Sequence, residues 1–399
     1  AFVLLPLYYK LNLTSIYTYL DVRFGKTAYR TGASFFLLSK MLGAAARLYL
    51  VCLILQNYVF GSMGVPFEIT AAGTVFLIWL YTFRGGIKSL VWTDALQTLC
   101  LITALVLILY QLCRLNDFTV TEAIRHVTES PYGRWIEWDD WTSRQHFVKQ
   151  FFSGVFIVIV MTGLDQDMMQ KNLTCKNLRD AQKDMCSYGL SFIPLNMLFL
   201  GMGILLLALA SREGIALPVK GDDILPLFCA EGYLGNEVLV LFTIGIIAAA
   251  FSSADSALTA LTTSFCVDIL DVERRFARPE AVRKRVHGVI ALLFVGFILC
   301  FEAVNDSSVI DAIYVVASYT YGPLLGLFAF GMFTRRKPWP AAVPWICVTA
   351  PVCCYLLDVW TASVYGYRFG YELLMLNGLF TFVGLYAFSK AYSPGMDKR

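Results

Sequence analysis

Long apolar segments, repeated along almost the whole chain, constrain the fold more than any other feature of this sequence. A helix that crosses the hydrocarbon layer of a bilayer, about 30 Å thick, needs about 20 mostly apolar residues, since each residue adds about 1.5 Å. None of the candidate segments shows the period-two alternation of a membrane β-strand. We count about ten such segments, at residues 34–60, 67–84, 89–112, 148–169, 186–210, 236–265, 283–302, 307–332, 340–358 and 371–389. The sequence therefore predicts an all-α integral membrane protein, with one transmembrane domain over residues 1–399.

The composition excludes several other classes of protein. Of the 399 residues 58% are hydrophobic and only 15% are charged, whereas soluble domains average about 25% charged residues. The net charge of +3 gives no support for a nucleic-acid-binding surface. His126, His146 and His287 lie in loops or at helix edges, away from cysteines at metal-ligand spacing. We therefore expect neither an enzyme nor a resident cofactor.

The distribution of Lys and Arg predicts the orientation in the membrane. If residues 1–33 are cytoplasmic, alternate crossings place 22 of the 32 basic residues on the cytoplasmic side and 8 on the other side of the membrane. The remaining two, Lys40 and Arg47, lie within a span. Cytoplasmic loops are enriched in basic residues, so the C-terminus is also expected to be cytoplasmic. The apolar stretch Ala1–Tyr9 is typical of the end of another membrane helix. We expect the chain to begin inside a larger protein.

The strongest local signal for function is a stripe of oxygen-bearing side chains within segment 236–265. Ser252, Asp255 and Ser256 are spaced by three and four residues, so they share one face of a helix that is otherwise mostly apolar. Hydroxyl and carbonyl oxygens are ligands that small hard cations prefer. Tight helix packing is the alternative, because it also uses small residues, but packing does not explain a carboxylate at Asp255. The stripe favours cation binding.

Asp94 is a carboxylate just inside segment 89–112. A charge within a span usually faces a water-filled site or a cation. The alternative places Asp94 near the interface, where it caps its helix or pairs with Lys88.

Residues 161–173 carry a second polar run, which includes Thr162, Asp165 and Gln166. The run predicts that the span breaks or ends here, and broken helices offer free backbone groups at membrane depth, where transporters bind solutes. An ordinary helix exit into a basic loop after Lys171 is the alternative.

Lys40 and Arg47 lie seven residues apart within one span and therefore on one helix face. An internal partner or snorkelling to the interface is the simplest interpretation for Lys40. Arg47 lies deeper, and a guanidinium there needs a carboxylate from the protein or from a bound solute.

Four stretches resemble, in the right order, motif regions of the sodium:solute symporter family. They are NLTSIYTYLDVRFG, GGIKSLVWTDALQ, DQDMMQKNL and AAAFSSADSALTALTTSFCVDIL. The resemblance implies a five-plus-five inverted-repeat fold of the leucine-transporter type. In that fold the chain would carry core helices three to ten over about 34–332 and two further helices over 340–389, without the first two core helices. The implied function is sodium-coupled import of a small organic solute by a monomer in the bacterial inner membrane.

The resemblance also implies roles for individual residues. The Ala249 carbonyl and the hydroxyls of Ser252 and Ser253 match the family's shared sodium site. A second sodium position, present in some members, matches Asp94, Ser252 and Ser256. Asp255 replaces a hydroxyl at that second position, where it would either strengthen ion binding or carry a proton.

For the solute, the resemblance favours an organic anion over a sugar. Sugar-carrying members have an aromatic pair where this chain has Met161 and Thr162, and a Gln where segment 307–332 has none. Thr162, Asp165, Gln166 and Arg47 are the expected solute-binding residues. A transporter-like sensor or channel is the alternative function.

Overall fold

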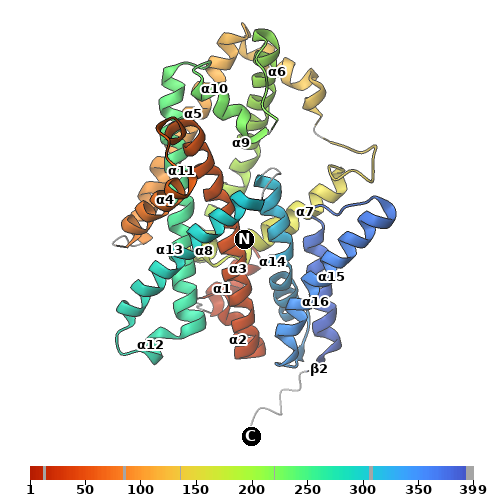
Figure 1. Cartoon of the computed structure of the whole chain (residues 1–399). Coiled ribbons are helices and arrows are strands. Elements are labelled where there is room, and N and C mark those ends of the chain that lie inside the picture. The colour runs from red at the N-terminus through yellow and green to blue at the C-terminus, as the bar shows by residue number, and fades with distance from the viewer. Residues whose placement is uncertain (12–14, 84–86, 135, 220, 305–308, 392–399) are drawn as a thin grey trace.

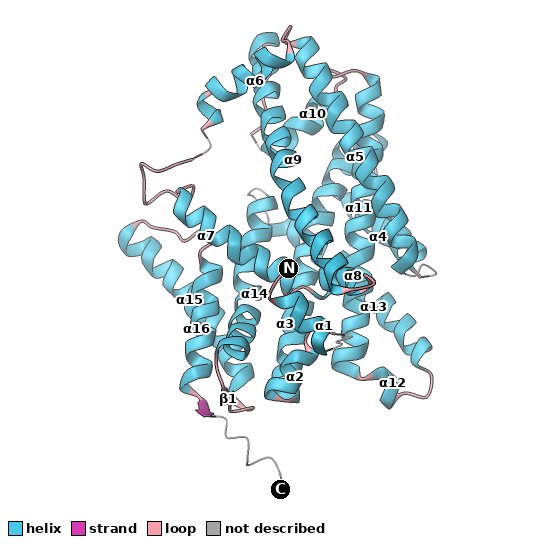
Figure 2. Ribbon diagram, turned by 180° about the vertical axis from the view of Figure 1, so that it is seen from behind, coloured by secondary structure: helices cyan, strands magenta, loops and turns pink. Residues whose placement is uncertain are grey.

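The computed structural model describes residues 1–11, 15–83, 87–134, 136–219, 221–304 and 309–391 (Figure 1). All ten predicted segments are mainly helical in their described residues, and residue 84 of segment 67–84 and residues 307 and 308 of segment 307–332 lie outside the described ranges. Figure 2 shows the same almost wholly helical architecture from behind. The longer helices are α3 (Lys26–Leu55), α4 (Phe67–Thr82), α5 (Ile87–Leu115), α7 (Phe147–Val158), α9 (Leu178–Glu213), α11 (Asn236–Ser264), α13 (Pro279–Val304), α14 (Val309–Phe333), α15 (Ala342–Tyr365) and α16 (Leu373–Ala387).

Short elements connect these helices or extend their ends. They are α1 (Leu4–Leu11), α2 (Thr18–Phe24), η1 (Gln56–Phe60), η2 (Gly61–Met63), α6 (Val120–Glu129), η3 (Pro131–Gly133), η4 (Ile159–Gly163), α8 (Gln166–Leu173), η5 (Gly221–Asp223), α10 (Ile224–Ala230), η6 (Phe265–Leu270) and α12 (Val272–Arg275). A short antiparallel sheet pairs β1 (Arg336–Pro338) with β2 (Ser389–Ala391), after α14 and α16 respectively. The apolar pattern did not predict this sheet.

Among the described residues, seven helices are long and apolar enough to cross a membrane. Counting the bent pair of Phe147–Gly163 and Gln166–Leu173 as one span gives eight. The shorter apolar helices α4 and α16 account for the two remaining predicted segments. The chain is thus a multi-pass membrane protein, and ten complete crossings and the inverted repeat stay predictions.

Helix α3 lies at the centre of the packing. It contacts α14 on one side and α11 and α13 on the other, with α15 and α16 beyond α14 and with α4 and α5 beside α11 (Figures 1 and 2). Alanines at positions 44, 45 and 46 are buried in the cluster that α3 forms with α4, α11 and α13. Small side chains let helices approach closely, and this brings the polar residues of α3 and α11 near one another.

Helix α14 is also tightly joined to α16. A β-carbon at Gly322 or Gly326 would collide with the side chains of Asn377 and Thr381, so the two helices need glycine there. Pro323 has no N–H, which leaves the carbonyl of Tyr319 without its helical donor. Asn377 Nδ2 supplies that donor at 2.9 Å and also donates to the Ser318 carbonyl at 3.0 Å.

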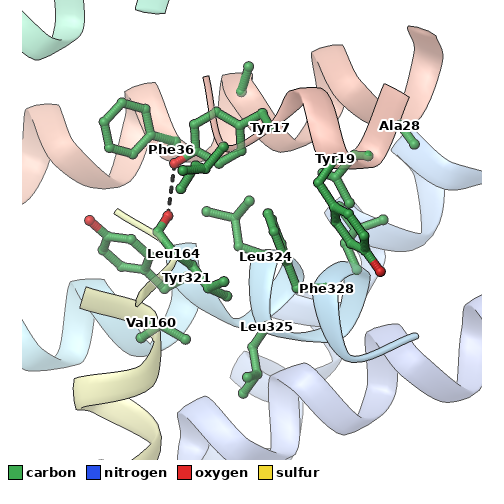
Figure 3. Close-up of a cluster of buried hydrophobic side chains, with 14 of the residues drawn as sticks. Tyr17, Tyr19, Ala28, Phe36, Val160, Leu164, Tyr321, Leu324, Leu325 and Phe328 are labelled. Carbon is green, nitrogen blue, oxygen red and sulfur yellow. Dashed lines mark hydrogen bonds between the residues drawn. The ribbon is translucent and has the colours of Figure 1, made fainter. Parts of the chain in front are cut away.

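The span at residues 148–169 is broken, as the sequence predicts. Helix α7 continues into the π-helical turn η4, and α8 begins at Gln166. The axis of α8 is bent by 62° from that of the preceding helix. The freed carbonyls find donors near the N-terminus, since Tyr8 donates to Gly163 at 2.9 Å and Tyr17 donates to Leu164 at 2.8 Å. Figure 3 shows the Tyr17 bond within a buried cluster that includes Phe36, Leu324 and Phe328.

Candidate functional site

Asp165 organises the polar groups at the helix break. Its carboxylate caps α8 by accepting hydrogen bonds from the backbone N–H groups of Asp167, at 2.9 Å, and Met168, at 3.4 Å. The hydroxyl of Tyr321 donates to the other oxygen at 2.9 Å. The cap satisfies backbone donors in the first turn of α8 and so stabilises a helix that is only eight residues long.

Lys40 crosses from α3 to this break. Its ammonium lies 3.1 Å from Asp165 and 2.9 Å from Asp167, and its side chain is only 5% exposed. Snorkelling is therefore wrong for Lys40, because the amine is buried between carboxylates and does not extend to an interface. The alternative of an internal partner is confirmed, with two partners on the far side of the break.

A second cluster joins α5, α8 and α11. The hydroxyl of Ser252 donates to one carboxylate oxygen of Asp94, and Lys171 lies 3.1 Å from the other. Lys171 also donates to the hydroxyl of Ser256 at 3.1 Å. The pairing of Asp94 with Lys88 cannot be compared, because the Lys88 side chain lies outside the described residues.

Lys171 belongs to this cluster, and the sequence pattern did not predict it. Its position at the end of an apolar span suggested a basic loop, but it lies within α8 and turns back towards α5 and α11. The available signal was its spacing of four residues from Asp167 in DQDMMQKNL, which puts both on one side of a helix.

Asp255 lies deeper in the same cluster. Its side chain is fully buried, and neither carboxylate oxygen has a hydrogen bond of ordinary geometry in the described part of the chain, although the adjacent Ser256 is close enough to act on it. Asp94 and Lys171 are close enough to act on it electrostatically. Buried carboxylates normally have partners, so this one marks a position where a cation or a donor is needed.

A cavity of about 440 Å³ adjoins the cluster. Arg47 of α3 lines it together with Ala249 and Ser253 of α11, and Gln97 of α5 also contributes. The remaining lining residues are Leu48, Leu50, Val51, Met161, Ile313 and Tyr314. The Nε atom of Arg47 is buried and has no acceptor among the described residues, so a guanidinium donor is available next to the cavity.

The residues expected to bind solute therefore fall into separate places. Arg47 lines the 440 Å³ cavity, whereas Thr162 lines another of about 410 Å³ between α1, α7 and α9. Asp165 is held by Lys40 and Tyr321, and the side chain of Gln166 accepts a hydrogen bond from the Ile16 N–H at 2.9 Å. The structure brings the expected cation ligands together more closely than the expected solute ligands.

Comparison with known proteins identifies a family model that matches residues 1–342, described as the sodium:solute symporter family. The sodium/sialic acid symporter NanT of Aliivibrio fischeri is 26% identical over 348 residues, which cover 83% of this chain and 66% of that protein. The sodium/sialic acid symporter SiaT of Proteus mirabilis is also 26% identical, over 86% of this chain and 70% of that protein. This chain thus spans about two thirds of the length of these relatives.

Other relatives carry different cargo by name. The human sodium/iodide cotransporter is 24% identical over 84% of this chain and 52% of its own length. The structure of a substrate-bound, outward-open Na⁺-coupled sialic acid symporter matches with a TM-score of 0.78, over 98% of this chain and 81% of that chain, at 20% identity. The match shows that the two chains share a fold.

Proposed function

The chain belongs to the sodium:solute symporter family, and on this premise we propose that it carries the ion and solute sites of a sodium-coupled importer of small organic anions. One observation carries the proposal: Arg47 and the sodium-site candidates Ala249 and Ser253 line the same cavity. An ion and an anionic solute bound there would be neighbours, so each would favour the binding of the other.

Sodium is proposed to bind at the Ala249 carbonyl and the hydroxyls of Ser252 and Ser253. These are neutral oxygen ligands on consecutive turns of α11, and a hard cation suits them. An adjoining second cation position is formed by Asp94, Ser252 and Ser256, with Asp255 in place of a further hydroxyl ligand. The buried carboxylate of Asp255 supports this assignment, because it has no hydrogen bond of ordinary geometry among the described residues.

The solute is proposed to be a carboxylate held by Arg47. A guanidinium makes two parallel hydrogen bonds to a carboxylate, and the Nε of Arg47 is free of protein acceptors within the described residues. The mainly apolar lining of the cavity fits the carbon skeleton of a small organic acid. The other candidate solute ligands stay Thr162, Asp165 and Gln166. Their positions support a role in solute binding less strongly than that of Arg47, because they do not line the same cavity.

The membrane potential would add to the driving force of each sodium ion, by about 2.3 kcal/mol per charge per 100 mV. Bacterial relatives support a bacterial inner membrane location. We propose a cytoplasmic C-terminus and a monomeric functional unit, as the basic-residue distribution and the family resemblance suggest.

The test is uptake by the full-length transporter in proteoliposomes, with labelled carboxylates, sugars and amino acids as candidates. We expect a carboxylate to accumulate with an inward sodium gradient and not with potassium in its place. Accumulation that is independent of sodium would reject the proposal. Current that flows without solute would instead support the channel alternative.

A further inference from the structure

The ammonium of Lys171 lies where the second cation of this site is expected. We infer that Lys171 is a tethered cation that fills the second position, so that only one sodium ion is coupled to each solute. The inference rests on the proposed sodium-coupled transport and specifies how many ions that transport uses.

The contacts of Lys171 are those of an ion in that position. Its nitrogen lies 3.1 Å from an Asp94 carboxylate oxygen and 3.1 Å from the Ser256 hydroxyl oxygen. These are two of the three residues assigned to the second cation position, and Ser252, the third, donates to the other oxygen of Asp94. A second sodium ion would need the same two oxygen atoms, so it would have to displace the amine.

Charge balance supports a single sodium ion. The cluster holds the carboxylates of Asp94 and Asp255 and the ammonium of Lys171. Asp94 and Lys171, whose side chains are 28% and 37% exposed, form an ion pair and balance each other. The buried carboxylate of Asp255 needs a further compensating cation. One sodium ion at Ala249, Ser252 and Ser253 supplies it, whereas a second would add a positive charge that no carboxylate of this cluster balances.

Helix α8 holds Lys171 in place. Asp167 lies one turn earlier on α8 and pairs with Lys40, and Asp165 caps the same helix. The amine is therefore carried by a short helix whose first turn is fixed to α3. The flexible stem of a lysine needs such an anchor before its charge can serve at a defined position.

The decisive variant is Lys171→Gln, in full-length transporter reconstituted into proteoliposomes. The Hill coefficient for sodium, whose upper limit is the number of coupled sites, should be about 1 in the unmodified protein and rise towards about 2 in Lys171→Gln. The reversal potential of the solute-coupled current should shift from the value expected for one sodium ion per solute towards the value expected for two sodium ions per solute. Adding Asp94→Asn to Lys171→Gln should return both quantities to the one-sodium values.

Matched variants separate this inference from general damage and from the proposed function. Lys171→Arg keeps the cation and should keep the one-sodium behaviour, and Lys176→Gln, at an exposed position just after α8, should change neither quantity. Two sodium ions in the unmodified protein, or an unchanged Hill coefficient in a folded Lys171→Gln variant, would overturn the inference and leave sodium coupling intact. Uptake without any sodium dependence would overturn the proposed function itself.

Discussion

Lys40 on α3 and Asp167 on α8 form an ion pair with 2.9 Å between Nζ and Oδ2, and their side chains are only 5% and 11% exposed. The same amine contacts Asp165, the N-cap residue of α8. The pair therefore fixes the broken span against α3, the helix that also presents Arg47 to the cavity. Any movement of α8 during transport must either carry Lys40 with it or break this pair.

Replacing Lys40 by Met should destabilise the protein strongly. Loss of one partner from a buried ion pair typically costs about 3–5 kcal/mol, because the remaining charge is left uncompensated. Here two carboxylates would lose their cation. Thermal unfolding of the purified protein in detergent should show a clearly lower midpoint.

Two further variants test the cause of that loss. The double variant Lys40→Met with Asp167→Asn removes one stranded charge and should recover part of the stability. Lys26→Met, at an exposed position on the same helix, should unfold near the unmodified midpoint. Equal midpoints for Lys40→Met and Lys26→Met would contradict the structural role of the pair.

Replacing Arg47 by Gln should weaken solute binding without abolishing sodium binding. A hydrogen bond to a charged group contributes about 1.5–3 kcal/mol, which corresponds to roughly a 10- to 150-fold higher KM for a carboxylate. The KM for uptake measures this, and an amide analogue of the solute should be affected much less. Arg125→Gln, which alters an exposed ion pair on α6, is the control. A KM for the carboxylate that stays the same would show that Arg47 does not contact it.

Much of the fold follows from local sequence. Length and apolarity predict the helical segments, and the polar run after Met161 predicts the break, because each depends on residues that are neighbours in the chain. The stripe of Ser252, Asp255 and Ser256 is also visible from helical spacing alone. The proposal that it binds sodium depends on the family resemblance, because helical spacing does not distinguish one cation from another.

The pairings between helices could not be obtained in this way. Lys40 and Asp165 are 125 residues apart, and Lys171 and Asp94 are 77 apart. Which helices meet depends on how close their small residues allow them to pack. Lys171 also looks like an ordinary loop residue in the sequence, since a basic side chain at the end of an apolar span usually marks an interface.

Replacing Asn377 by Leu should lower stability although the residue is remote from the cavity. The change removes the donor that serves the carbonyls of Ser318 and Tyr319, and the Tyr319 carbonyl has no helical alternative because of Pro323. A buried acceptor left without a donor costs about 1–3 kcal/mol. The thermal midpoint measures the loss, and Asn196→Leu, at a half-buried position on α9, is the matched control. Equal midpoints would argue against this role for Asn377.

Replacing Ser253 by Ala should raise the sodium concentration needed for half-maximal uptake. The hydroxyl is one of few proposed ligands, and losing about 1–2 kcal/mol of ion binding changes the required concentration roughly 5- to 30-fold. Ser191→Ala, which removes an exposed hydroxyl from α9, should leave that concentration unchanged. Because Ser253 also lines the cavity of Arg47, the decisive quantity is sodium dependence at saturating solute. A variant that keeps its sodium dependence there while its solute KM rises would assign Ser253 to the solute and remove it from the ion site.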